Sequence, residues 1–437
     1  TILIGLGTGF RIIGSRYAPD TRRLREFAAR NRLPHRWIDL EQDAGAERLL
    51  HTLGVPPEDT PVVILRGSEV LRNPSNEELA RRLGLLHADD GETSCDLLVV
   101  GAGPAGLAAS VYGASEGLTT ILIDGVATGG QAGTSSRIEN YLGFPAGISG
   151  AELAERAEIQ AGKFGARIEV PAEATAIAAR DGGYDVTFGE DDESVRARSV
   201  VVACGVRYRR LPIARLEELE GVSVYYAATL MEAQLCAGDP IVVVGGGNSA
   251  GQATLFLSEY VPKIHLVVRA ATLDQDMSRY LTDRIERTPN VELHTSTEAR
   301  ELVGERALEA VVVENNTTGE RDTLEARAMF VFIGAKPHTD WLGGLVELDS
   351  GGYVRTGRDV TSSAAGSDGD GPVHQPLMLE TSQPGIFAAG DVRSGSIKRV
   401  AAAVGDGSIS VRLVHEHLAG RHDADRGAHA SAVAAGS

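Results

Sequence analysis

Short apolar runs alternate with helix-like segments along most of the chain, and glycine-rich turns follow several of the runs. Among these runs are CDLLVV at 95–100, IVVV at 241–244 and IHLVV at 264–268. Runs of this length between turns are typical of fully buried strands, and the alanine-rich stretches after the first two have the composition of helices. The alternation predicts an α/β fold whose sheets are covered by helices.

The first 88 residues repeat this alternation on a smaller scale. Their hydrophobic and polar positions predict strands at 10–15, 35–41 and 60–65, and helices at 19–31, 45–54 and 73–85. The set is short enough to form a separate small α/β domain. The polar segment HADDGETS at 87–94 is expected to link it to the rest of the chain.

Composition and charge exclude several classes of protein. A net charge of −18 and a pI near 5.1 argue against nucleic-acid binding, which needs a basic face. No apolar run is long enough to cross a membrane, and no signal peptide is visible. The three cysteines form no CxxC pair, and the eleven histidines show no recognised ligand spacing. We expect a cytoplasmic protein without a metal centre.

The first glycine turn has the spacing of a dinucleotide-binding loop. GAGPAG at 101–106 opens an alanine-rich helix, and the next apolar run ends at Asp124. In such a loop Gly101 makes the tight turn, Gly103 lets the backbone approach a pyrophosphate, and Gly106 lets helix and strand pack closely. Asp124 stands where a carboxylate accepts hydrogen bonds from a ribose.

A second glycine turn follows the strand at 241–244. Its fingerprint residues and the start of the following helix are Gly245, Gly247, Asn248, Ser249 and Ala250. The next strand ends in Arg269, without the acidic residue that would hold the ribose of NADH. An arginine better accommodates the 2′-phosphate of NADPH, although a solvated charge at a strand end is the alternative.

Two further segments resemble the flavin-binding parts of low-molecular-weight thioredoxin reductases. They are GGQAGTSSRIENYLGFP at 129–145 and PGIFAAGDVRSGSIKRVAAAV at 384–404. Together with both glycine turns and MFVFIG at 329–334, they follow that family's order over about residues 94–420. The resemblance implies two Rossmann-like three-layer domains, with the FAD domain split by an inserted NADPH domain, and a homodimer.

The same resemblance implies which residues contact each cofactor. FAD contacts would come from Gly101, Gly103, Pro104, Ala105, Gly106, Asp124, Gly130, Gln131, Asn140, Asp391, Lys398, Arg399 and Val400. NADPH contacts would come from Gly245, Gly247, Asn248, Ser249, Ala250, Arg269, Ile333 and Gly334. The expected divisions are a lead domain at 1–88, an FAD domain at 94–212 and 341–420, an NADPH domain at 221–340, and a flexible tail at 421–437.

The lead domain resembles thioredoxin and glutaredoxin in the order of its elements. Ser15 and Ala18 stand where those domains carry their two redox cysteines, and Thr60–Pro61 where they carry a cis-proline turn. Neither serine nor alanine forms a disulfide. The domain is therefore either a docking or peptide-binding module, or a structural remnant or spacer.

The reductase part lacks a dithiol as well. Thioredoxin reductases carry Cys-Ala-Thr-Cys just before the NADPH strand, where this chain has Ala227 and Leu230 at the thiol positions. Cys236 lies six residues beyond Leu230, and a lone thiol cannot form the internal disulfide of a two-electron relay. We interpret it as a small buried hydrophobic residue and assign no redox role to Cys95 or Cys204.

These features together imply an NADPH-dependent FAD oxidoreductase with a non-disulfide acceptor, which is a small molecule, a quinone, oxygen or a redox protein. Electron flow from a ferredoxin-like donor is a variant of the same hypothesis. A non-catalytic redox or NADPH sensor is the main alternative, and disulfide reduction with a partner's cysteines is a weaker one. The chain begins with Thr1, which fits a longer parent protein with an upstream regulatory domain.

Overall fold

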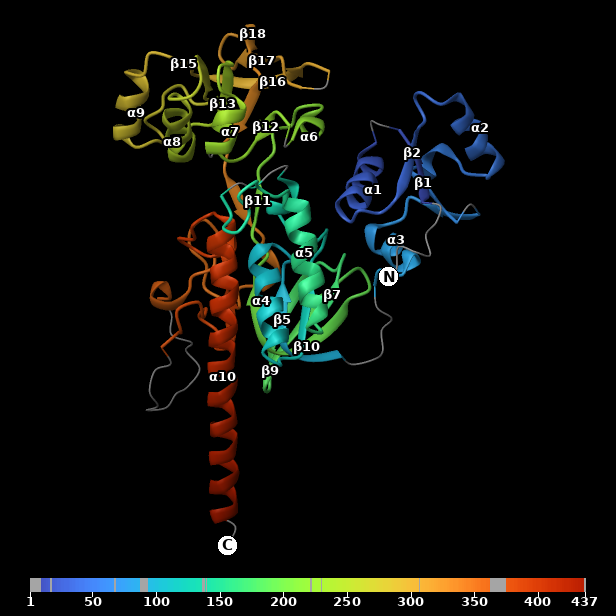
Figure 1. Ribbon diagram of the computed structural model, residues 1–437, viewed down its shortest axis with the longest axis vertical. Helices are drawn as coiled ribbons and strands as arrows, with labels where there is room; N and C mark the ends of the chain where they lie inside the picture. The colour runs from blue at the N-terminus through green and yellow to red at the C-terminus, as the bar shows by residue number, and fades with distance from the viewer. Residues whose placement is uncertain are drawn as a thin grey trace. The chain divides into compact units, whose positions relative to one another are not determined.

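The computed structural model describes residues 9–435, except for 16–17, 67, 87–92, 136–137, 139, 221, 229, 306 and 362–374. Most of the expected linker therefore lies outside the described residues. The chain divides into two compact units. One consists of Thr1–Gly205 and Pro337–Ser437, and the other of Val206–Lys336 (Figure 1).

The part of the first unit that contains the expected lead domain, here called the lead region, is a small α/β structure within residues 9–86. In chain order it contains β1 (Phe10–Gly14), α1 (Pro19–Arg30), β2 (His35–Asp39), α2 (Ala44–Thr52), β3 (Val62–Leu65), β4 (Glu69–Arg72) and α3 (Asn76–Leu83). The sheet order is β2-β1-β3-β4, with β1 parallel to β2 and antiparallel to β3. All six predicted elements are confirmed, β4 was not predicted, and the Thr60–Pro61 peptide bond is cis.

A seven-stranded sheet forms the rest of the first unit. Its path is β7-β6-β5-β10-β9-β8, and β21 pairs with β10. The strands are β5 (Thr93–Val100), β6 (Thr120–Ile123), β7 (Arg167–Glu169), β8 (Ala174–Arg180), β9 (Gly183–Phe188), β10 (Glu193–Val202) and β21 (Ile386–Ala388). The helices are α4 (Pro104–Ser115), α5 (Gly150–Lys163) and α10 (Val400–Ala435).

The two faces of this sheet bury different side chains because successive residues of a strand point to opposite sides. Leu97 and Val99 of β5 pack in a core with apolar residues of α4 and α10, whereas Leu98 and Val100 pack in a core on the opposite face. Gly407 lets α10 cross α4 closely, since a Cβ there would collide with the Ala105 carbonyl oxygen. The apolar run predicted to be a buried strand is therefore confirmed.

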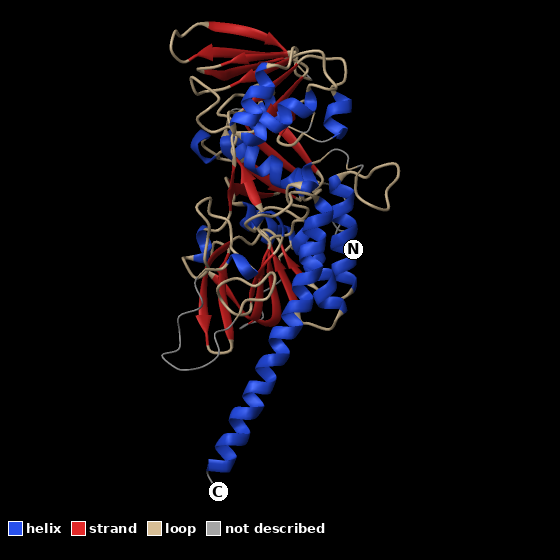
Figure 2. Cartoon of the chain, turned by 90° about the vertical axis from the view of Figure 1, so that its left-hand side faces the viewer, coloured by secondary structure: helices blue, strands red, loops and turns tan. Residues whose placement is uncertain are grey.

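The tail expected to be flexible is helical over residues 421–435, where α10 continues as one helix to Ala435 (Figure 2). The segment is small and polar, which led to the prediction. It is also rich in alanine, the residue with the highest helix propensity, and contains no proline. Gly436 and Ser437 lie outside the described residues.

The second unit is built around a five-stranded parallel sheet with the order β12-β19-β13-β14-β15. Its strands are β12 (Val224–Tyr225), β13 (Ile241–Val244), β14 (Ile264–Val267), β15 (Val291–His294) and β19 (Ala328–Val331). A second, antiparallel sheet contains β16 (Thr297–Val303), β17 (Ala310–Asn315) and β18 (Arg321–Glu325). The helices are α6 (Leu216–Leu219), α7 (Leu230–Leu235), α8 (Asn248–Leu257) and α9 (Arg279–Glu286).

A short pair of strands, β11 (Val206–Tyr208) and β20 (Ala335–Pro337), lies where the chain passes from one unit to the other. The architecture is an α/β nucleotide-binding fold, as the alternating pattern predicted. Within the described part of the chain, no helix combines the length and hydropathy needed to span a membrane.

Candidate dinucleotide sites

The first glycine turn connects β5 to α4 and is too tight for side chains at two positions. Gly101 has φ +111°, and a Cβ there would collide with the Ala203 carbonyl. A Cβ at Gly106 would collide with the Gly101 carbonyl oxygen. Gly103 differs, because it caps α4 with ordinary dihedrals and has open space around its Cβ direction. The turn thus leaves room for a ligand at the N-terminus of α4, where free N–H groups favour anions.

Asp124 ties this turn to the loop that follows β6. Its Oδ2 accepts a hydrogen bond from the Ala102 N–H at 2.8 Å, and its Oδ1 accepts from Val126 and Ala127 N–H groups at 2.9 and 3.2 Å. A carboxylate offers about four acceptor positions, so these three bonds leave capacity for a ribose hydroxyl. The position fits the role implied by the sequence.

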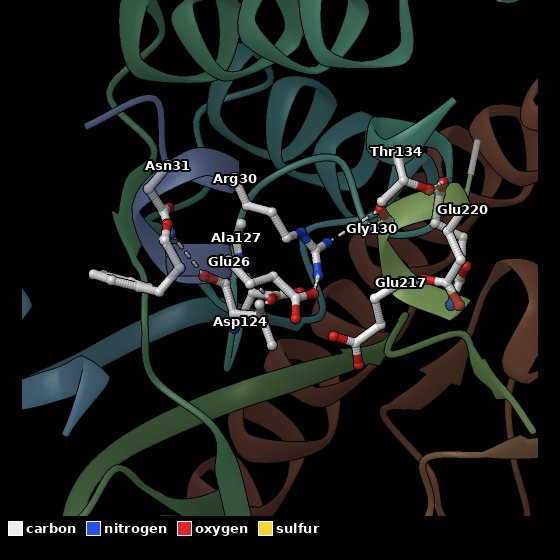
Figure 3. Close-up of polar contacts among 12 residues, drawn as sticks. Glu26, Arg30, Asn31, Asp124, Ala127, Gly130, Thr134, Glu217 and Glu220 are labelled. Atoms are coloured by element: carbon white, nitrogen blue, oxygen red, sulfur yellow. Dashed lines mark hydrogen bonds and ion pairs between the residues drawn. The ribbon is translucent and has the colours of Figure 1, made fainter. Parts of the chain in front are cut away.

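The lead region contacts the loop beside the turn (Figure 3). Gly130 lies against Gly103, since a Cβ on it would be 2.9 Å from the Gly103 Cα. The Arg30 guanidinium donates to the Gly130 carbonyl at 3.3 Å, and Asn31 Nδ2 donates to the Val126 carbonyl at 3.0 Å. No sequence pattern pointed to Arg30 or Asn31, because only the packing of α1 brings them to carbonyls that are 100 and 95 residues away.

We expect the double variant Arg30→Ala with Asn31→Ala to release FAD about fivefold faster than the wild type. Losing the two hydrogen bonds to the loop is expected to lower the free-energy barrier to FAD release by about 1 kcal/mol. The effect is small because water partly replaces each lost bond. The measurement is the rate of flavin release after dilution, followed by the rise in free-flavin fluorescence. Arg11→Ala, an exposed position on β1, is the matched control. An unchanged release rate in the double variant would show that these contacts do not support the loop.

Asp391 follows β21 and is partly buried. Burial raises the pKa of this carboxyl above its usual value; Lys398 opposes the shift and Asp406 adds to it. Asp406 also accepts from the Gly390 N–H at 3.1 Å and from Arg393 Nε at 3.3 Å. A buried carboxylate requires hydrogen-bond donors, and the hydroxyls of a ribityl chain are suitable ones.

Of the other residues expected near FAD, Pro104 and Ala105 begin α4, where Ala105 is buried, and most of the rest lie at the surface. Gln131, Asn140, Lys398 and Arg399 are exposed, and Val400 begins α10. Lys398 Nζ lies 5.3 Å from the centre of the Tyr353 ring and 3.4 Å from its hydroxyl oxygen. The contacts described above bring together the glycine turn, Asp124 and Gly130. They do not extend to Asn140.

The second glycine turn, between β13 and α8, repeats the construction of the first. Gly245 has φ +144°, and a Cβ there would collide with the Phe332 carbonyl oxygen. Gly247 caps α8, and a Cβ on it would make only an ordinary contact, at 3.9 Å, with the Asp276 carbonyl oxygen. Asn248 Oδ1 accepts from the Ser278 N–H at 2.7 Å. The remaining expected residues are Ser249, exposed; Ala250, buried; Arg269, exposed beyond β14; and Ile333 and Gly334, which follow β19.

Two of the three cysteines occupy positions that disfavour a reactive thiolate. Cys95 and Cys236 are buried, and burial raises the pKa of their thiols to about 12 and about 11. Cys204 donates from Sγ to the His338 carbonyl at 2.9 Å. Of the positions where the family dithiol was expected, Ala227 is exposed and Leu230 begins α7, while Thr229 between them is outside the described residues.

Two glycine turns, each between parallel neighbouring strands of its sheet, have the construction of dinucleotide-binding sites. Comparison with known proteins agrees: residues 95–407 match the model of the pyridine nucleotide-disulphide oxidoreductase family. The thioredoxin reductase of Treponema pallidum is 33% identical, over 75% of this chain and 98% of its own. The 34.2 kDa protein in the rubredoxin operon of Clostridium pasteurianum is 32% identical, over 76% and 99%.

Solved structures give the same result. The thioredoxin reductase of Streptococcus pyogenes has a TM-score of 0.65 and 29% identity, covering 76% of this chain and 100% of its own. The chain therefore belongs to the pyridine nucleotide-disulphide oxidoreductase family, with thioredoxin reductases among its homologues. FAD and NADPH are the cofactors that go with this membership.

Proposed function

We propose that the chain is an NADPH-dependent FAD oxidoreductase whose electron acceptor is not a disulfide of its own. The observation that carries the proposal is the state of its three cysteines: all are free, and burial raises the pKa of the Cys95 and Cys236 thiols. Thiol–disulfide exchange requires a thiolate and a second sulfur within bonding reach. Burial disfavours the thiolate at Cys95 and Cys236, and none of the three thiols is paired in a disulfide.

The chain's own residues support binding and electrostatics at both cofactor sites. Bound FAD would supply the ring that accepts hydride from NADPH. The N–H groups at the N-termini of α4 and α8 favour the pyrophosphates of the two cofactors. Asp124 would accept from a ribose of FAD and Asp391 from its ribityl chain. The cations at 398–399 and the N-terminus of α10 would stabilise negative charge on a reduced flavin.

The lead region is proposed to be a thioredoxin-like docking domain without redox chemistry. Its sheet order and its three helices support the fold. Ser15, at one expected cysteine position, donates to Glu41 Oε1 at 2.7 Å. The hydrogen bonds from Arg30 and Asn31 to the loop beside the first glycine turn support packing of this domain against the FAD domain of the same chain.

A thiol count before and after reduction is a direct consequence of the proposal. We expect the oxidised protein, denatured anaerobically with a thiol reagent, to show three thiols per chain. The count is expected to stay at three after reduction by NADPH, because no disulfide opens. A gain of two thiols on reduction would mean that a disulfide exists and takes part. A thioredoxin reductase with its dithiol is the matched positive control.

Anaerobic mixing of the FAD-loaded protein with NADPH in a stopped flow tests the function itself. We expect rapid loss of the flavin's visible absorbance, after which small-molecule, quinone and redox-protein acceptors can be ranked by how fast each restores it. NADPH binding without loss of absorbance would contradict the proposal and favour a sensor or a flavoprotein supplied by another donor.

Reduction of a disulfide with cysteines from a partner is the second candidate function, and the names of the thioredoxin reductase relatives favour it. In the same instrument, oxidised thioredoxin would then restore the flavin absorbance only when the cysteine-bearing partner is present. Restoration by a quinone or oxygen alone would favour the first proposal.

A further inference from the structure

A cluster of two histidines and one glutamate lies at the edge of the parallel sheet in the second unit, where β15 is the outermost strand (Figure 1). The register of the parallel pair places His265 on β14 opposite Glu292 on β15. His294 is two residues beyond Glu292 and therefore shares its face of the sheet. The fold thus brings together three metal-binding side chains that are up to 29 residues apart in sequence.

The ligand atoms of this cluster are at the separation that a small divalent cation requires. His265 Nδ1 lies 3.0 Å from His294 Nε2. Glu292 Oε2 lies 3.7 Å from His265 Nδ1, and Glu292 Oε1 lies 3.6 Å from His294 Nε2. One ligand atom from each of the three residues can be chosen so that all lie within 4.8 Å of one another. In a tetrahedral site with metal–ligand bonds of about 2.0–2.1 Å, neighbouring ligand atoms are about 3.3 Å apart. The observed separations bracket this value, so a cation needs only small side-chain shifts.

We propose that His265, Glu292 and His294 form a binding site for a divalent transition-metal cation, with Zn²⁺ the best match. Two imidazoles and one carboxylate are the ligand types that Zn²⁺ prefers, whereas Mg²⁺ and Ca²⁺ prefer oxygen alone. His265 is buried, and Glu292 is half exposed. Three protein ligands with one open side leave a coordination position for water.

Two neighbouring groups affect the cluster in opposite ways. Lys263 Nζ forms an ion pair with Glu292 Oε2 at 2.7 Å and competes with a cation for that oxygen. Asp322 of β18 adds negative potential at both imidazoles, which favours a cation. Burial lowers the pKa of both histidines.

The second acidic group in the described residues, Glu77 with Asp191 and Glu193, is different. It contains no histidine, and the guanidinium of Arg81 lies 2.8–3.8 Å from all three carboxylates. One cation of the chain therefore already pairs with all three carboxylates. This contrast leaves the histidine cluster as the candidate metal site. The proposal departs from the sequence-based expectation of no metal centre, which had no signal to use because the three residues come from two paired strands.

Calorimetric titration of Zn²⁺ into tag-free, FAD-loaded protein, stripped with a chelator, tests the proposal. We expect one Zn²⁺ per chain. Glu292→Gln, at a partly exposed position that does not threaten the fold, and His294→Ala are each expected to weaken binding by about 100-fold. Lys263→Gln is expected to tighten binding by about fivefold, since it releases the competed oxygen. His51→Ala, an exposed histidine on α2, is the matched control and should change nothing.

The three outcomes separate a metal site from a structural polar network. Absence of stoichiometric Zn²⁺ binding to the wild type would overturn the proposal. Binding that survives both Glu292→Gln and His294→Ala would place the metal elsewhere and overturn it as well. Opposite effects of Glu292→Gln and Lys263→Gln would support it, because a network without metal has no reason to bind Zn²⁺ more tightly when Lys263 is removed.

Discussion

Replacing Gly106 by alanine is expected to abolish FAD retention and to lower the free energy of unfolding by about 3 kcal/mol. The added Cβ would collide with the Gly101 carbonyl oxygen, which is backbone and cannot move without opening the turn. Urea unfolding of the purified variant and the flavin content after gel filtration measure the two effects.

Two further glycine variants separate the effect on stability from the effect on FAD binding. Gly162→Ala near the end of α5 meets nothing within 4 Å and is expected to be neutral or stabilising, as alanine usually is in a helix. Gly103→Ala also has open space in the protein alone, so its stability should be unchanged. If a pyrophosphate approaches this backbone, however, FAD affinity should fall by about tenfold or more. Full FAD affinity in Gly103→Ala would contradict the assignment of this turn.

Replacing Arg269 by alanine is expected to weaken NADPH binding by about 30-fold and to leave NADH binding nearly unchanged. Arg269 is exposed directly after β14, where a guanidinium can bind the 2′-phosphate through charge-assisted hydrogen bonds. Each such bond contributes about 1.5–3 kcal/mol. The measurement is the dissociation constant for each nucleotide, from fluorescence or calorimetric titration.

Arg327→Ala, at another exposed arginine of the same unit, controls for the general loss of positive charge. A small, equal loss for NADPH and NADH in Arg269→Ala would mean that Arg269 is only a solvated charge at the end of a strand. That was the alternative left open by the sequence.

The parts of the fold with a strong local signal were predictable from sequence. The apolar strand that ends at Val100, the glycine turn and the alanine-rich helix after it each have a periodicity or spacing that one physical cause explains. The lead region was predictable for the same reason, except for β4, whose residues Glu69–Arg72 alternate too briefly to be distinguished from a turn.

Other features depend on contacts between distant segments and could not be predicted. Arg30 and Asn31 looked like the ordinary polar end of α1, and only tertiary packing reveals the carbonyls that they contact. In the sequence, Asp406 looks like any polar residue of a helix. Only the structure shows that it accepts hydrogen bonds from Gly390 and Arg393. His265 is part of an apolar run, and strand pairing alone places it opposite Glu292.

The most direct test of the central claim is an anaerobic reductive titration that counts electrons per bound FAD. A flavin without a dithiol takes up two electrons, whereas a flavin with an active disulfide takes up four, because a disulfide is itself a two-electron couple. The account predicts that one equivalent of dithionite per FAD completes the reduction. A requirement for two equivalents would show a redox disulfide in the chain and contradict the account.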